Sequence, residues 1–193
     1  MFSAMKEQLI NYVRKIISVN DEQLDTIVSC FRHLEVDKNE LLVIQGQTSQ
    51  RTFFVGAGCL RIFFITEAGQ EATRYIAFEN HFATALSSFI SGEPSSEFIQ
   101  ALETSSLLYI SHKDFHFLLE TIPVWGRFYQ HYLENAYVKN TNRLLSFLTL
   151  NANERYKYLM ANNPEIIQRL SNKVVASYLN ISQETLSRLK SKR

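Results

Sequence analysis

The 193-residue sequence contains little proline, glycine or cysteine. Its 3 Pro and 6 Gly exclude collagen-like and linker-rich chains. No apolar run approaches the roughly 18 residues that a membrane-spanning helix needs. The amino terminus has no basic stretch followed by a long apolar one, so we expect neither a signal peptide nor a membrane partner. Hydrophobic residues nevertheless make up 46% of the chain, which is enough for a sizeable core.

The sequence also lacks the usual signatures of metal sites and enzymes. Cys30 and Cys59 form no Cys-x-x-Cys pair, so we expect free, reduced core thiols in a cytoplasmic protein. The five histidines do not follow the spacing of a metal-dependent dioxygenase. A serine nucleophile elbow and a phosphate-binding glycine loop are absent. We therefore expect no enzyme activity, no metal and no cofactor.

Charge is divided unevenly along the chain. Residues 1–150 hold 12 Lys and Arg against 16 Asp and Glu, whereas residues 151–193 hold 8 against 3. A small basic unit attached to a mildly acidic body favours a polyanionic partner for that unit. On charge alone, a solvated, lysine-rich helical surface is an equally good explanation.

Hydrophobic periodicity predicts helices at both ends and strands between them. Up to residue 31, apolar positions recur at helical spacing in two blocks, separated by a capping Asn20-Asp21 pair. Residues 34–110 contain roughly seven or eight β-branched and aromatic runs broken by turns, typical of an antiparallel sandwich or barrel. Gly46, Gly56 and Gly58 are expected to need positive φ.

A long helix is predicted for residues 124–150, beginning behind Pro123. Its stripe of large apolar and aromatic side chains extends beyond what a single packed face needs. Two interpretations stay open. The helix is either a core helix on the β-sandwich, or it is shared between its own chain and a second copy.

The strongest local signal lies in residues 171–193. Ser171 can cap a helix that Asn180 ends in the left-handed conformation. Ala176 is small enough to let another helix cross closely, and Ser182 can cap a second helix. This layout is typical of a helix-turn-helix whose second helix enters the major groove of DNA.

The second helix is predicted to present a polar face that reads base edges. Arg188 can fork onto guanine, Glu184 can accept from cytosine N4, and Gln183 can pair with adenine. The predicted interface, including groups for phosphate oxygens, is Ser182, Gln183, Glu184, Thr185, Ser187, Arg188, Lys190 and Lys192. A plain helical hairpin with polar outer residues is the alternative.

With these motifs in place, the chain resembles the Crp/Fnr family of bacterial transcription regulators. Residues 35–46 and 53–61 are similar to its cyclic-nucleotide-binding β-roll, and residues 176–188 are similar to its recognition motif. Within that motif, Glu184, Ser187 and Arg188 match the Fnr-like base-reading set.

The resemblance implies an α+β fold and a function. It implies an antiparallel β-roll, or jelly-roll, then a long dimerisation helix and a small C-terminal helix-turn-helix that is winged-helix-like with a truncated wing. The corresponding domains are residues 1–122, 123–150 and 151–193. The implied partners are double-stranded DNA with a palindromic site, a second copy of the chain in a homodimer, and RNA polymerase as a further candidate.

The sequence departs from the family in the cyclic-nucleotide pocket. The family's ribose-binding Gly-Glu pair aligns with Thr84 and Ala85, and its phosphate-binding Arg and small hydroxyl residue align with Ser95 and Ser96. No lysine or arginine occurs in residues 75–112. A buried phosphate without a cation is costly to desolvate. We therefore expect no regulatory affinity for cyclic AMP.

A pocket of another specificity is still a candidate here. Its predicted lining is Phe82, Thr84, Ala85, Leu86, Ser87, Ser88, Ser95 and Ser96. The pocket either holds a neutral or weakly polar small-molecule effector, or it is filled. A third functional class also stays open, a ligand- or partner-binding module that has lost DNA binding, because the sequence ends straight after the predicted recognition helix.

Overall fold

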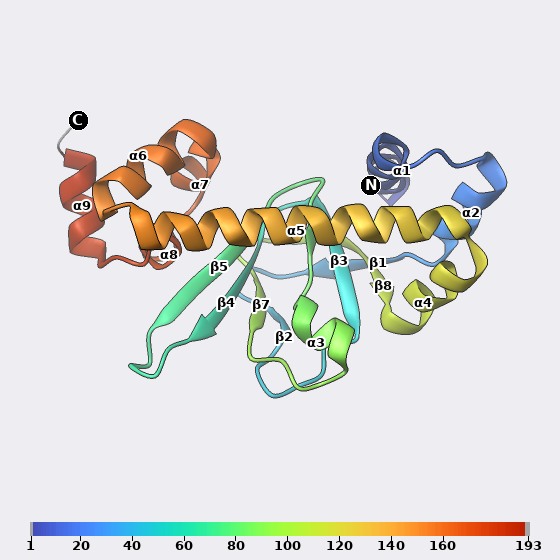
Figure 1. The fold of residues 1–193 in the computed structure, drawn as a ribbon, viewed down its shortest axis with the longest axis horizontal. Helices are drawn as coiled ribbons and strands as arrows, with labels where there is room; N and C mark the ends of the chain where they lie inside the picture. The colour runs from blue at the N-terminus through green and yellow to red at the C-terminus, as the bar shows by residue number, and fades with distance from the viewer. Residues whose placement is uncertain (1, 192–193) are drawn as a thin grey trace.

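The computed structural model describes residues 2–191, in which eight strands form two four-stranded antiparallel sheets (Figure 1). The strands are β1 (Arg32–Val36), β2 (Leu41–Val43), β3 (Arg51–Ala57), β4 (Leu60–Ile65), β5 (Glu71–Ala77), β6 (Phe82–Ala83), β7 (Phe98–Ala101) and β8 (Ser105–Ser111). One sheet has the order β1-β8-β3-β6 and the other β2-β7-β4-β5. Val55, Leu60, Ile99 and Leu107 are fully buried in one apolar cluster that joins the two sheets. The antiparallel β-roll predicted from the sequence is confirmed.

Helices lie at both ends of the roll, and a long helix connects them (Figure 1). They are α1 (Phe2–Ile16), α2 (Asp21–Ser29), α3 (Leu86–Ser91), α4 (His112–Thr121), α5 (Pro123–Thr149), α6 (Ala152–Asn162), α7 (Pro164–Arg169), α8 (Asn172–Leu179) and α9 (Gln183–Ser191). The short helices α3 and α7 are not among the predicted elements. Within residues 2–191, no helix combines the length and apolarity that a membrane crossing requires.

Two of the three glycine predictions are confirmed and one is wrong. Gly46 and Gly58 have φ of 87° and 100°, in the left-handed region that favours glycine. Gly56 instead lies inside β3 and has no positive φ. A Cβ atom there would overlap the Met5 side chain of α1, so this glycine is needed for the close approach of a helix to the sheet.

The N-terminal helices pack with α4 and the start of α5 against the β1-β8-β3-β6 sheet. Leu9, Ile27, Leu118 and Trp125 are fully buried in this cluster. Asn20 caps α2 as predicted, because its side chain accepts a hydrogen bond from the backbone of the third helical residue. These contacts fix the direction in which α5 leaves the roll.

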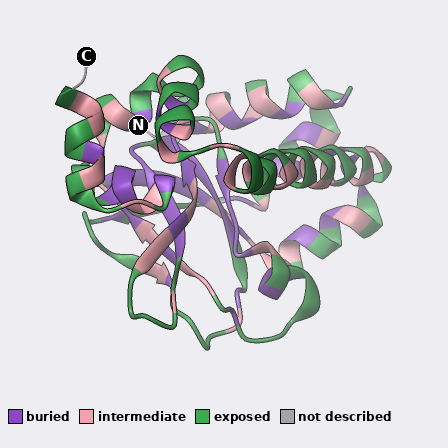
Figure 2. Ribbon diagram, turned by 60° about the vertical axis from the view of Figure 1, so that its left-hand side comes forward, coloured by how far each residue is buried: buried purple, intermediate pink, exposed green. Residues whose placement is uncertain are grey.

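The two ends of α5 have different surroundings. Trp125 is 0% exposed near its start, whereas Tyr137 is 73% and Leu148 is 72% exposed further along. Figure 2 shows this change as a largely green outer face on the long helix. Tyr137 and Leu144 are seven residues apart, as are Val138 and Leu145, which is the heptad spacing of paired helices. The second half of α5 therefore carries an apolar stripe that the rest of residues 2–191 does not cover.

The C-terminal helices share a core with the roll. Val175, Leu179 and Leu186 of α8 and α9 are buried in one cluster with Ile76 and Phe78, which lie in and just after β5. Polar contacts reinforce this interface. The Arg169 guanidinium bonds Glu79 at 2.8 Å and Glu103 at 2.5 Å, and the Thr73 backbone donates to the Ser177 hydroxyl at 2.9 Å. The position of α8 and α9 is thus set by contacts with β5.

Candidate nucleic-acid interface

The turn between α8 and α9 is built by local polar contacts. The Ser171 hydroxyl accepts from the Val174 backbone at the start of α8. Asn180 ends that helix with φ 52° and ψ 54°, and its N–H donates to carbonyls in the last turn. The Ser182 hydroxyl accepts from the Thr185 backbone at 3.1 Å and begins α9. The sequence predicted all three of these roles.

The inner side of α9 is fixed by burial. Leu186 is 0% exposed and packs in the same cluster as Val175 and Leu179 of α8. Figure 1 shows α9 at the end of the molecule opposite α2 and α4. The opposite face of the helix is therefore held outward on a rigid support.

That outer face carries the predicted base-reading side chains. Gln183, Glu184, Ser187 and Arg188 are all exposed. Arg188 donates to the Thr185 hydroxyl at 3.2 Å, across one turn of the helix. Within the described part of the chain, the side chains of Gln183, Glu184 and Ser187 have no hydrogen-bond partner in the structure. Their donors and acceptors are available to an external surface.

The predicted phosphate-binding groups are placed less uniformly. Thr185 and Lys190 are half-buried, and Ser182 is exposed. The Lys190 ammonium donates to the Asn172 side chain at 2.6 Å, which links α9 to the start of α8. A phosphate oxygen would have to share this lysine with Asn172. Lys192 lies outside the described residues.

The predicted ligand pocket corresponds only in part to a cavity. A cavity of about 220 Å³, here called the roll cavity, lies between the β-roll and α5. Phe82, Thr84 and Leu86 line it, together with Tyr12 of α1 and Tyr132 of α5. The Tyr132 hydroxyl donates to Thr84 at 3.1 Å. Burial raises the pKa of Tyr132 to about 12, so this hydroxyl stays protonated at neutral pH.

The other predicted pocket residues do not line the roll cavity. They are Ala85, Ser87, Ser88, Ser95 and Ser96. The Ser88 hydroxyl accepts from the Ser49 backbone at 2.9 Å and donates to the Glu93 carbonyl. The Ser95 hydroxyl bonds both the N–H and the carbonyl of Glu97, each at 3.0 Å. Ser87 and Ser96 are exposed. The Ser88 hydroxyl thus joins α3 to the segment before β3, and the Ser95 hydroxyl bonds a neighbouring residue of its own loop.

Two basic residues line the roll cavity that the sequence did not predict to lie there. Arg74 of β5 and Lys139 of α5 line its wall. The Arg74 guanidinium is already held by the Glu97 carboxylate through two hydrogen bonds. The sequence offered no signal for this, because Arg74, Glu97 and Lys139 are brought together only by the fold.

Comparisons with known proteins agree with this geometry. Residues 33–122 match the profile of the family described as "Cyclic nucleotide-binding domain". No curated protein matches the chain. Among solved structures, the chain is similar to the c-di-GMP responsive global regulator CLP of Xanthomonas campestris, at 15% identity and a TM-score of 0.72, over 90% of this chain and 91% of that one.

Two further structures support the same fold. FixK2 from Bradyrhizobium japonicum is 14% identical with a TM-score of 0.72, over 84% of this chain and 83% of that one. The catabolite activator protein of Thermus thermophilus is 21% identical with a TM-score of 0.59, over 91% of this chain and 84% of that one. The predicted Crp/Fnr resemblance is confirmed, and at these identities it shows the fold.

Proposed function

We propose that this chain, which has the fold of Crp/Fnr regulators, is a DNA-binding transcription regulator that acts as a cytoplasmic homodimer. The outer face of α9 is the observation that carries the proposal. Its side chains stand on a helix whose other side is buried, and they are exposed to solvent. The proposed division is a sensor unit (1–122), a dimerisation helix (123–150) and a DNA-binding unit (151–193).

The residue roles follow from side-chain chemistry. Arg188 reads guanine through two parallel hydrogen bonds, Glu184 accepts from cytosine, and Gln183 pairs with adenine. The hydroxyls of Ser182 and Thr185 bind phosphate oxygens near the start of the helix. Ser187 completes the reading face, while Lys190 and Lys192 supply phosphate charge. RNA polymerase is a further partner that a regulator of this kind would contact.

Salt-dependent DNA binding tests the first part of the proposal. Fluorescence anisotropy with a labelled random duplex should show binding at low salt that weakens steeply as salt rises, by a logarithmic slope of roughly −0.9 per phosphate neutralised. Arg188→Glu should weaken binding. Arg127→Glu, which changes an exposed arginine near the start of α5, should have little effect on DNA binding. No binding to any duplex, with the dimer intact, would instead support a module that has lost DNA binding.

The exposed stripe of α5 supports the homodimer. Leu144, Leu145 and Leu148 are 58%, 49% and 72% exposed on the helix that would pair with its copy. Light scattering should find a dimer for the unaltered chain and a monomer for Leu144→Glu combined with Leu148→Glu. Phe117→Glu is the matched control, because Phe117 is 47% exposed but lies on α4. A dimer that survives the double substitution would contradict this assignment.

The roll cavity suggests an effector that carries no phosphate. Its wall combines aromatic rings, such as Tyr12 and Phe82, with hydroxyl groups. Of its two basic residues, Arg74 is paired with Glu97 and Lys139 is exposed to solvent. These groups suit a neutral or weakly polar small molecule. Calorimetry with cyclic AMP should find no complex at micromolar concentration, and a micromolar or tighter complex would overturn this part. We propose no catalytic activity for the chain.

A further inference from the structure

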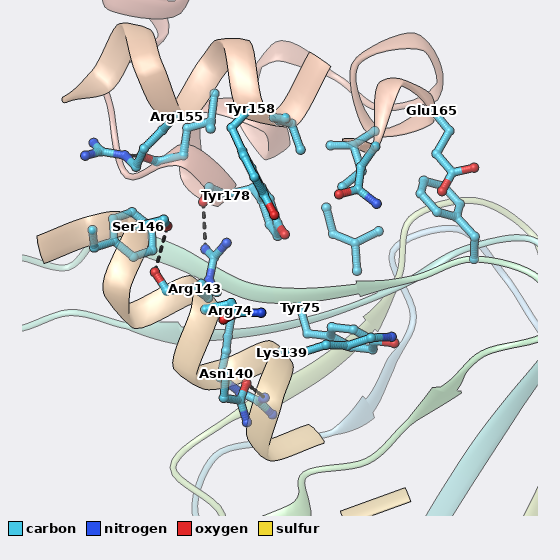
Figure 3. A pocket seen from close by; sticks show the side chains of 18 of the residues that line it. Arg74, Tyr75, Lys139, Asn140, Arg143, Ser146, Arg155, Tyr158, Glu165 and Tyr178 are labelled. Atoms are coloured by element: carbon cyan, nitrogen blue, oxygen red, sulfur yellow. Dashed lines mark hydrogen bonds between the residues drawn. The ribbon is translucent and has the colours of Figure 1, made fainter. Parts of the chain in front are cut away.

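A second cavity, of about 260 Å³, lies where β5, the C-terminal half of α5 and the helices α6 to α8 meet (Figure 3). We call it the junction cavity. It adjoins the roll cavity, since both are lined by Arg74, Tyr75 and Lys139. The proposed reading of DNA by α9 makes no use of it.

Basic side chains outnumber acidic ones on its wall. The lysine and arginines that line it are Arg74, Lys139, Arg143 and Arg155. Glu165 is the one carboxylate among the described lining residues, and His81 is a further titratable group there. Glu97, outside the wall, neutralises Arg74. In the part of the chain that the structure describes, the other three cations have no carboxylate partner within ion-pair distance.

Arg143 lies between β5 and α8. Its guanidinium donates to the carbonyl of Thr73 in β5 at 2.7 Å and to that of Tyr178 in α8 at 2.6 Å. It also lies over the Tyr178 ring, 4.0 Å from the centroid. Figure 3 shows it bridging α5 and the helices above. Burial lowers the pKa of Arg143, and the charges of Arg74 and Arg155 lower it further, yet an arginine stays charged at neutral pH.

Arg155 is held in the same way. Its guanidinium donates to the carbonyls of Leu150 at 2.7 Å and Leu179 at 3.3 Å, which end α5 and α8. Arg143 and Arg155 both lie over the Phe147 ring, at 4.9 Å and 5.0 Å from its centroid. Two like charges are thus kept close together without an acid between them. Such an arrangement favours an anion, because guanidinium groups bind phosphate strongly.

The rest of the wall offers neutral donors and flat surfaces. Tyr75, Tyr158 and Tyr178 contribute rings and hydroxyl groups, and Asn140 contributes an amide. Burial raises the pKa of Tyr75, so its hydroxyl remains a neutral donor. In Figure 3, Tyr158 extends from α6 toward the arginine side chain of α5. The rings can stack on a planar group while the cations hold its charged end.

We propose that the junction cavity binds a small phosphate monoester, with an organic part no larger than a nucleoside, and that the bound ligand alters the setting of α8 and α9 against the roll. A dianion matches the excess of cations, and the volume is small for a ligand pocket. Arg143 connects the ligand to α8, because the same guanidinium bonds β5 and α8. The binding of the ligand does not depend on the proposed function, whereas its effect on DNA binding rests on that function.

Calorimetry on the full chain tests the binding step, with AMP, adenosine and inorganic phosphate as probes. AMP should bind saturably, and adenosine should bind about tenfold more weakly or not at all. Arg143→Gln and Lys139→Gln should each weaken AMP binding by about tenfold, while Arg127→Gln should not. Lys139 is exposed, so its variant keeps the test valid if Arg143→Gln fails to fold.

Three results would overturn the binding step. They are no saturable AMP binding at millimolar concentration, AMP binding that is as tight in both cavity variants as in the unaltered chain, and equal affinity for AMP and adenosine. If inorganic phosphate bound as tightly as AMP, the proposal that the ligand has an organic part would be wrong, and the ligand would be free phosphate.

DNA anisotropy with and without AMP separates this proposal from the proposed function. AMP should change the DNA affinity of the unaltered chain, and Lys139→Gln should need about tenfold more AMP for the same change. A chain that binds AMP but no DNA would overturn the proposed function and keep the site. A chain that binds DNA but no AMP would overturn the site and keep the function. AMP binding without any change in DNA affinity would overturn the coupling.

Discussion

The outer face of α9 and the segment 84–96 of the β-roll are both rich in polar side chains, yet they use them in opposite ways. On α9, Gln183 and Glu184 point into solvent without a partner in the described chain. In the segment, the buried hydroxyls of Ser88 and Ser95 are hydrogen-bonded to backbone groups of the β-roll. The segment therefore uses its buried hydroxyls to stabilise the fold, whereas the α9 face leaves its polar groups exposed to solvent.

Side-chain length explains much of this difference. Serine hydroxyls are short and bond readily to backbone groups nearby, especially in loops. Glutamine, glutamate and arginine on an exposed helix reach away from a backbone that is already hydrogen-bonded. A buried polar residue in the segment should therefore affect the stability of the fold, and an exposed one on the α9 face should affect DNA binding.

Removing the buried support of α9 should have the largest effect. Leu186→Ala is expected to lower the free energy of unfolding by about 2–5 kcal/mol, because it leaves a cavity in the cluster shared with the roll. Urea denaturation measures this. Ile90→Ala, at an isoleucine of α3 that is 53% exposed, is the control and should change stability little. An unchanged midpoint for Leu186→Ala would show that the α9 face has no rigid support.

A hydroxyl of the segment should contribute to stability and not to DNA binding. Ser88→Ala is expected to cost about 1–3 kcal/mol of unfolding free energy, since it leaves the Ser49 N–H and the Glu93 carbonyl without their partner. Ser87→Ala, at the exposed neighbour, should be close to neutral. If Ser88→Ala changed DNA affinity and left stability intact, the comparison would fail.

A side chain on the α9 face should contribute to DNA binding and not to stability. Arg188→Ala is expected to cost about 1–3 kcal/mol of discrimination between a mapped operator and random duplex. The substitution should change the free energy of unfolding by less than about 0.5 kcal/mol relative to the unaltered chain, because Arg188 is exposed. Anisotropy with both duplexes and urea denaturation check the two halves of this statement. Unchanged operator binding would mean that another face reads the DNA.

The ion pair that joins α7 to the β-roll should show a smaller effect that depends on pH. The hydrogen bonds from Arg169 lower the pKa of Glu79 from 4.5 to about 2. A lowered folded-state pKa contributes stability that is complete above about pH 4.5 and is lost as the pH falls toward about 2. Denaturation at pH 6 and pH 3 should show that Glu79→Gln loses this dependence. Glu120→Gln, at an exposed residue of α4, should keep it.

Much of the candidate DNA interface could be predicted because its signals are local. Ser171, Asn180 and Ser182 each act on backbone groups within a few residues of themselves. The start of α5 at Pro123 and the cap of α2 at Asn20 have the same basis. Turn and cap chemistry depends on neighbours in the chain, so a single sequence contains it.

The misses arose where distant segments meet. Gly56 reads as a turn residue, but its role depends on α1 approaching β3. The roll cavity was assigned to the 82–96 loop, whereas Tyr12 and Tyr132 complete its wall from two helices. The short helices α3 and α7 have too few residues to show a helical period.

The sequence by itself determined the order of the strands and the longer helices and the separation of α9 into a buried and a polar side, because these follow from periodicity and local hydrogen bonding. Only the tertiary structure decided which basic side chains of the described residues have no carboxylate partner and where cavities remain. Arg143 shows why, since its two carbonyl partners are 70 and 35 residues away along the chain. Charge compensation and empty space depend on which distant side chains the fold brings together.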